Sequence, residues 1–161
     1  MSPIRLAVAA LLMSALVAGC GVVSTTPPPS GPGDFADITK ELARLGIRIE
    51  DVVSGDAGCT DQELIPTAIG FDASGLDQTS VVRMHLFIFR NHDVFEKVRG
   101  AVDGCAGSFV TDPETFESID ESPYVLAAQG PWAQQFEAAL RSGLKVAAGD
   151  GGAGSGGYGA Y

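Results

Sequence analysis

Apolar residues recur every three or four positions in three segments of the chain, a spacing that places them on one face of an α-helix. The segments span residues 34–46, 91–104 and 131–144. Residues that favour helix ends stand at their limits: Asp34, Asn91 and Pro131 at the beginnings, Gly46 and Gly104 at two of the ends. We therefore predict three amphipathic helices, with these core-facing residues: Phe35, Ile38, Leu42, Leu45, Val94, Phe95, Val98, Val102, Trp132, Phe136, Leu140 and Leu144.

Alternating apolar and polar residues, or short apolar runs, predict five β-strands between these helices. The strongest strand covers residues 79–90, because its β-branched and aromatic content suits the centre of a sheet. On this strand Arg83 and His85 share one face. The other predicted strands are residues 47–53, 65–75, 106–110 and 123–129, the second of them ending in a turn over residues 72–77.

The order of these elements, αβββαββα, predicts an α+β fold with helices packed on a mainly antiparallel sheet. The elements occupy residues 34–148, enough for one domain with one hydrophobic core. Residues 20–33 begin with Cys20 and continue without charge through four prolines, so we predict a semi-extended tether. The glycine-rich residues 149–161 are predicted to be a disordered tail.

The N-terminal segment carries one basic residue, Arg5, and then an uncharged run at residues 6–17 that is apolar except for Ser14. A transmembrane helix needs about 20 apolar residues, whereas a run of 12 has the length of the hydrophobic region of a signal peptide. The run ends in the sequence VAGC, residues 17–20. This sequence resembles the lipobox of bacterial lipoproteins, which has an aliphatic residue, two small residues and a cysteine.

The resemblance implies that residues 1–19 are a lipoprotein signal peptide and that cleavage leaves Cys20 as the first residue. It also implies a diacylglycerol on the Cys20 sulfur and often an acyl chain such as palmitate on its amine. The protein would then be exported and anchored by lipid in the bacterial cell envelope, on the outer membrane of a diderm or the outer face of a monoderm cell membrane. Gly21, in place of an aspartate, implies release from the inner membrane of a diderm. Ordinary secretory cleavage, an uncleaved anchor and a buried helix remain the alternatives.

The charge of the chain limits its partners. The formal net charge is −10, and cleavage would remove Arg5, leaving nine basic residues against 20 acidic ones and a net charge of −11. An anionic membrane surface would repel such a domain, so attachment is expected through the lipid on Cys20. Nucleic acid is excluded as a partner for the same reason, because no stripe of Lys and Arg is present to meet phosphates.

Two cysteines remain in the globular part of the chain, Cys59 and Cys105. In an exported protein an even pair of cysteines predicts a disulfide. A metal site or a catalytic thiol would need further ligands or a partner base. Neither a C-x-x-C motif nor a Cys/His cluster accompanies them, so the disulfide is the preferred interpretation.

Few residues offer chemistry. Arg83 and His85 form a candidate ligand face, on which His85 and a neighbouring carboxylate would suit a small hydrolase. The second histidine, His92, is interpreted as a surface residue. An acidic segment at residues 111–122 is predicted to be a solvated loop, with a calcium site as its alternative, and carries Asp112, Glu114, Glu117, Asp120 and Glu121.

No dinucleotide, phosphate-loop or serine-hydrolase motif is present, so we predict no cofactor and assign no catalytic residue. The sequence is therefore most typical of a lipid-anchored envelope protein with a non-enzymatic binding role, whose partner is another envelope protein. The small hydrolase and the calcium-dependent surface module are the two alternatives.

Overall fold

The computed structural model describes residues 34–149. The predicted signal peptide, the tether and residues 150–161 of the predicted tail lie outside this range. Within it, three α-helices and a five-stranded antiparallel sheet follow one another in the order αβββαββα, which confirms the α+β prediction. The elements are α2 (Phe35–Arg44), β1 (Ile47–Ser54), β2 (Ala68–Gly75), β3 (Gln78–Ile88), α3 (His92–Ala106), β4 (Phe116–Glu121), β5 (Tyr124–Gln129) and α4 (Gln134–Ala147).

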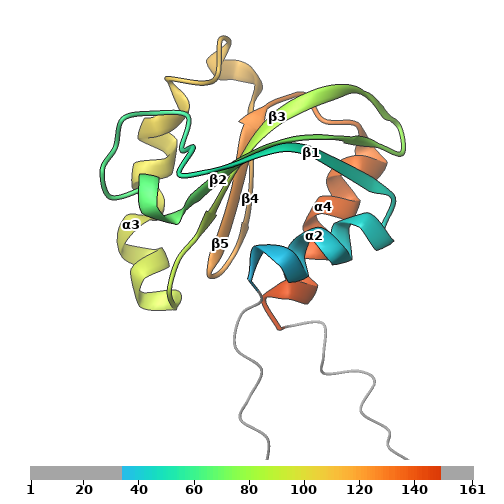
Figure 1. Cartoon of the computed structure of the whole chain (residues 1–161). Coiled ribbons are helices and arrows are strands. Elements are labelled where there is room, and N and C mark those ends of the chain that lie inside the picture. The colour runs from blue at the N-terminus through green and yellow to red at the C-terminus, as the bar shows by residue number, and fades with distance from the viewer. Residues whose placement is uncertain (1–33, 150–161) are drawn as a thin grey trace, which may run out of the picture.

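The helices cover both faces of the sheet (Figure 1), whose strand order is β1-β2-β3-β5-β4. Helices α2 and α4 pack side by side on one face, and α3 lies on the other. Because side chains alternate along a strand, the central strand β3 sends Met84 and Leu86 into the first core and His85 and Phe87 toward α3. Burial on both faces holds for residues 84–87 and matches the largely apolar end of this strand.

The predicted N-caps of the first two helices are present. The Asp34 carboxylate accepts a hydrogen bond from the backbone N–H of Asp37, and the Asn91 side chain accepts one from Val94. Helix α4 begins at Gln134 and not at Pro131 as predicted. Its own N-cap residue is an alanine, which has no side-chain acceptor, and the cap is supplied from elsewhere in the chain.

Two predicted elements are wrong. Residues 106–110 form no strand, because α3 continues past Gly104 to Ala106 and is followed by a turn. Helix α3 extends because Val102, Cys105 and Ala106 continue its buried face. The acidic segment 111–122 is not all loop, since it contains β4.

Strand β4 can be recognised only from the three-dimensional structure and not from its sequence pattern. Its single fully buried residue, Ile119, faces α4, while the charged residues around it lie at the edge of the sheet. The two errors cancel in the element count, so the predicted order is correct although one strand was placed about ten residues too early.

The second predicted strand begins at Ala68 and not at residue 65. A short 3₁₀ turn (Ile65–Thr67) precedes β2, and Asp72 lies within that strand. The turn to β3 is made by Leu76 and Asp77, between the paired residues Gly75 and Gln78.

Candidate functional site

The predicted ligand residue Arg83 is held by acceptors from three segments. Its Nη2 donates to the Asp56 carboxylate at 2.6 Å, and its Nη1 donates to Asp72 at 3.1 Å and to the backbone carbonyl of Asp51 at 2.9 Å. The hydrogen bond to Asp56 raises the pKa of Arg83. Two carboxylates thus surround one guanidinium, which leaves it unsuited to binding an anion.

The contact with Arg83 also affects the pKa of Asp56. Partial burial acts to raise the pKa of the Asp56 carboxyl, but hydrogen bonds from Arg83 and from the Gly58 N–H outweigh it, and the pKa lies below its ordinary value. The carboxylate sits directly over Gly70 on β2, where a Cβ atom would clash with Asp56 Oδ2. A side chain at this position would displace the Asp56 carboxylate from its contact with Arg83, so glycine leaves room for the ion pair.

His85 is buried beneath this loop and is only 3% exposed. Its Nδ1 lies 3.1 Å from the backbone carbonyl of Asp56, an acceptor, so this nitrogen carries the proton. The Phe109 ring packs against the imidazole at a centroid distance of 4.4 Å. On the remaining side lies Gly58, where a Cβ atom would come within 2.8 Å of His85 Nε2.

Burial lowers the pKa of His85, and nearby Arg83 lowers it further, against the opposing effect of Asp56. The ring is therefore neutral at pH 7 and enclosed by Phe109 and the loop. A general base must reach the proton that it removes from a substrate. The position of His85 does not provide that access, so the geometry gives no support to a hydrolase that uses it.

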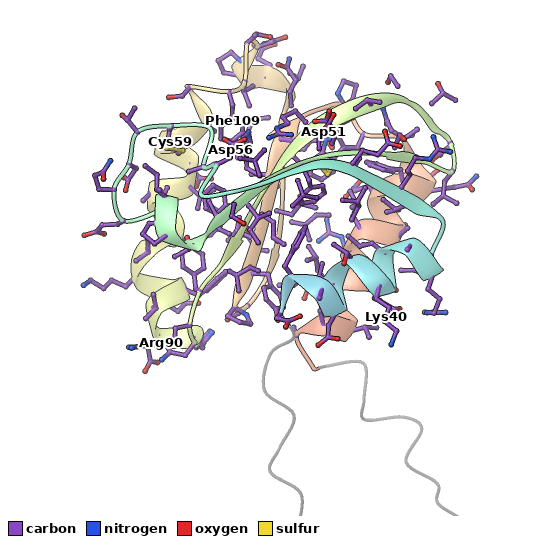
Figure 2. All side chains as sticks on the ribbon, viewed as in Figure 1. Lys40, Asp51, Asp56, Cys59, Arg90 and Phe109 are labelled. Carbon is purple, nitrogen blue, oxygen red and sulfur yellow. A yellow bond between two sulfur atoms is a disulfide. The ribbon has the colours of Figure 1, made fainter. Side chains whose placement is uncertain are left out.

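The covering loop is fixed by a disulfide. Cys59 and Cys105 are bonded, as predicted, with their Cα atoms 5.5 Å apart. The bond joins the loop after β1 to the last turn of α3. Figure 2 shows Asp56, Cys59 and Phe109 at the same end of the molecule, so the predicted ligand face is a covered structural cluster.

The acidic residues considered for calcium are dispersed. Asp112 caps the short 3₁₀ turn before β4, Glu117 accepts the backbone N–H of Trp132, and Asp120 pairs with Arg99. Alternation along β4 sends Glu117 and Asp120 to opposite faces of the sheet. Within residues 34–149 no cluster of three or more potential metal ligands is found.

Sequence reasoning missed a contact between His92 and Ser122. Nδ1 of His92 lies 2.8 Å from Ser122 Oγ, and its Nε2 lies 3.7 Å from Glu96 Oε1. The residue types are those of a nucleophile, a base and an orienting acid. However, the second distance exceeds hydrogen-bond length, and His92 and Glu96 are 68% and 63% exposed, so we assign no chemistry to this contact.

An open groove of about 820 Å³ runs between α2 and β1, which lie next to each other in Figure 1. Strand β1 is an edge strand of the sheet, so one side of its backbone has no neighbouring strand. The groove is lined by Phe35, Thr39, Lys40, Ala43, Gly46, Ile47, Arg48, Ile49, Val52 and Gly75.

The charged lining residues of this groove are Lys40 and Arg48, and the lining contains no carboxylate. In a chain with twice as many acidic as basic residues, this composition is unusual. Neither cation forms a salt bridge among the described residues, whereas Arg44, Arg83, Arg99 and Arg141 all do. The two positive charges are therefore available to a ligand.

The groove also has apolar surface. Phe35 and Ile49 are half-buried along it, and Val52 is 48% exposed. Beyond Glu50 the strand is interrupted, because the pairing with β2 shifts register and Asp51 has a φ of +48°. Such a bulge limits the pairing surface to the first half of β1.

The sequence gives no sign of this groove. Arg48 fits the polar phase of a strand and Lys40 the solvent face of a helix, which are ordinary positions for such residues. That both line one groove depends on the turn at Gly46, which folds β1 back along α2.

Comparisons with known proteins provide no relative from which a site could be transferred. No family model matches the chain, and no curated protein or solved structure matches it either. Among residues 34–149, no helix has the length and apolar character needed to cross a membrane.

Proposed function

We propose that this protein is a lipid-anchored binding module of the bacterial cell envelope, attached through Cys20 and engaging an envelope protein through the α2–β1 groove. The observation that carries the binding role is the groove itself, whose lining holds no carboxylate and two cations that form no salt bridge within residues 34–149. The anchoring role rests on the resemblance of residues 17–20 to a lipobox.

A binding role is favoured over catalysis by the chemistry of the two candidate regions. The Arg83 cluster is internally neutralised and His85 is enclosed. The polar side chains of the groove are Thr39, Lys40 and Arg48, which offer hydrogen bonds and charge but no pair of nucleophile and base.

The position of the groove suits a tethered module. Phe35 lines the groove and stands 15 residues after Cys20. At about 3 Å per residue, a proline-rich tether of this length reaches up to roughly 45 Å. The groove would thus meet partners within that distance of the membrane, while the net charge of the domain keeps it off an anionic surface.

Fractionation of cells that express the full chain tests the anchor. We expect the wild type in the membrane fraction, with an intact mass that includes the lipid, and Cys20→Ala either released or left unprocessed. Ser24→Ala, a small change a few residues into the tether, is the matched control and should fractionate like the wild type. Equal fractionation and an unlipidated mass for wild type and Cys20→Ala would refute the anchor.

Crosslinking in intact cells, followed by affinity purification of the lipidated protein, tests the binding role. A specific envelope protein should be recovered in stoichiometric amounts and should be lost when the domain, residues 34–148, is replaced by an unrelated soluble domain on the same anchor. Recovery of the same proteins by both forms would argue against a binding function for the domain.

A further inference from the structure

We infer that the α2–β1 groove binds an extended peptide segment carrying acidic residues, which adds to β1 as a sixth strand of the sheet. This inference deepens the proposed binding function and rests on it. The occupant is a segment of a partner protein, and three features of the groove define its chemistry.

The first feature is the backbone of β1. As an edge strand it has β2 on one side only, and alternate residues direct their N–H and C=O groups away from that neighbour. The groove follows Ile47, Arg48 and Ile49, the regular part of the strand before the bulge. An extended peptide can satisfy such a row of groups along its length, which a compact small molecule cannot.

The second feature is charge. Lys40 on α2 and Arg48 on β1 both line the groove. Because Ile47 and Ile49 face the core under α2, alternation directs Arg48 to the opposite face of the sheet, so the two charges flank the edge of β1 from its two faces. Neither has an ion-pair partner among the described residues, and no carboxylate lines the groove with them. Asp or Glu side chains on the bound strand would complete these contacts. The acidic residues elsewhere on the chain would repel a peptide whose acidic side chains do not lie close to Lys40 and Arg48.

The third feature is apolar contact. An added strand alternates its side chains between the two faces of the sheet, so every second one would point to the side covered by α2. There it would meet Phe35, Ile49 and the exposed Val52. We therefore expect aliphatic or β-branched residues at alternate positions of the peptide.

A second copy of the chain suits this edge poorly. Two β1 strands paired with each other would place the Lys40 side chains of both copies beside the same seam, and the lining of neither groove includes a carboxylate. The net charge of −10 on each copy adds a long-range repulsion. An anionic lipid headgroup would satisfy the cations but would leave the backbone groups of β1 unpaired.

Selection of random dodecapeptides displayed on phage, with the oxidised domain as bait, tests the inference directly. We expect enriched peptides with Asp or Glu and with apolar residues at alternate positions. Their affinity, measured by fluorescence anisotropy with the synthetic peptides, should fall roughly tenfold or more in Lys40→Glu/Arg48→Glu at low salt and less at high salt.

The control variant is Arg90→Glu/Lys97→Glu, which makes the same change in charge. Arg90 precedes α3 and Lys97 lies within it, on the side of the sheet away from α2. Figure 2 shows Arg90 and Lys40 at separate sides of the molecule. Because both cations are exposed and outside the groove, this variant should bind the peptides about as well as the wild type.

Backbone methylation of the best peptide separates strand addition from simple charge attraction. An N-methyl group removes one donor and blocks pairing on that side, so methylation at every second position should abolish binding while methylation at the intervening positions has little effect. A uniform effect along the peptide would overturn strand addition, as would a selection that enriches no peptide or only peptides that both charge variants bind equally.

The two alternative occupants of the groove, a second copy of the chain and an anionic lipid headgroup, are tested by separate measurements. Concentration-dependent dimerisation in sedimentation that is lost in Lys40→Glu/Arg48→Glu would replace the peptide by a second copy. Binding of vesicles containing an anionic phospholipid, lost in the same variant, would replace it by a lipid headgroup. If cellular crosslinking recovers a partner whose capture is unchanged in Lys40→Glu/Arg48→Glu, the binding function stands and the groove assignment fails.

Discussion

The carboxylate of Asp56 and the guanidinium of Arg83, 27 residues apart in the chain, meet at 2.6 Å. The contact fastens the loop after β1 to the middle of β3. The same loop covers His85 and is bonded through Cys59 to α3. Arg83 and His85, which the sequence marks as the best candidates for chemistry, are therefore the residues that hold this loop on the sheet.

Asp56→Ala is expected to lower the free energy of unfolding by about 1–2 kcal/mol. A hydrogen bond between charged groups contributes about 1.5–3 kcal/mol when buried, and the side chains here are 28% and 37% exposed, so solvent screening reduces the figure. Urea denaturation at pH 7 measures it. Asp93→Ala, which removes an exposed carboxylate from the first turn of α3, should change stability by less than about 0.5 kcal/mol. Equal losses in the two variants would contradict the anchoring role of Asp56.

The lowered pKa of His85 predicts a stability that falls on mild acidification. Below about pH 6.5 the unfolded histidine binds a proton that the folded, buried ring does not, so the free energy of unfolding decreases with falling pH until the folded pKa is reached. The slope is at most about 1.4 kcal/mol per pH unit. Asp56, whose folded pKa is also lowered, contributes a separate loss only below about pH 3.8.

Denaturation of the wild type and of His85→Gln at pH 7.5 and pH 5.5 tests this prediction. The variant should lose less stability between the two pH values. Taking the difference between wild type and variant removes the contribution of Glu117, whose pKa is raised by burial, and of the other carboxyls. His92→Gln, which changes the exposed histidine and leaves His85 in place, should keep the wild-type dependence. A wild type and His85→Gln with the same pH dependence would show that His85 titrates freely.

The disulfide between Cys59 and Cys105 is expected to contribute roughly 4 kcal/mol, because it closes a segment of 46 residues in the unfolded chain. Cys59→Ala/Cys105→Ala should therefore unfold at a much lower urea concentration. The wild type in reducing buffer should approach the stability of this variant, and the reductant should leave the variant itself unchanged. A wild type as stable with reductant as without it would place the stabilisation elsewhere.

The elements with strong periodicity were predictable from the sequence. Helix α2 and strand β3 carry long, regular apolar patterns, and the Asp34 and Asn91 caps are local in sequence. Strand β4 was not predictable, because its charged residues interact with α3 and with the segment after β5, through Arg99 and Trp132. Its one deeply buried residue is too little for a sequence pattern.

Some features of the candidate sites were likewise predictable from the sequence, and others were not. Pairing of Cys59 with Cys105 followed from the count of cysteines, and the shared face of Arg83 and His85 followed from strand alternation. Burial of that face did not, since it depends on a loop that enters from another part of the chain and on Phe109 after α3. The groove of Lys40 and Arg48 is likewise a product of packing between two elements.

The N-terminus of α4 is capped by a residue that lies far from the helix in the sequence. The Asp77 carboxylate, in the turn between β2 and β3, accepts hydrogen bonds from the backbone N–H groups of Gln135 and Phe136 at 2.9 Å and 3.0 Å. It satisfies two donors at the helix N-terminus and places a negative charge at the positive end of the helix dipole. The cap therefore ties the β2–β3 hairpin to the helix that covers the sheet.

Asp77→Ala should lower the free energy of unfolding by about 1 kcal/mol, within the usual range of 0.5–2 kcal/mol for an N-cap. Asp77→Asn keeps one side-chain oxygen as an acceptor and loses the charge, so we expect an intermediate loss. Asp112→Ala is the matched control, because Asp112 caps only a three-residue 3₁₀ turn and should matter less. Hydrogen exchange of the Gln135 and Phe136 amides should accelerate in Asp77→Ala and not in Asp112→Ala. Unchanged exchange of these two amides in Asp77→Ala would refute the capping role even if the variant were less stable.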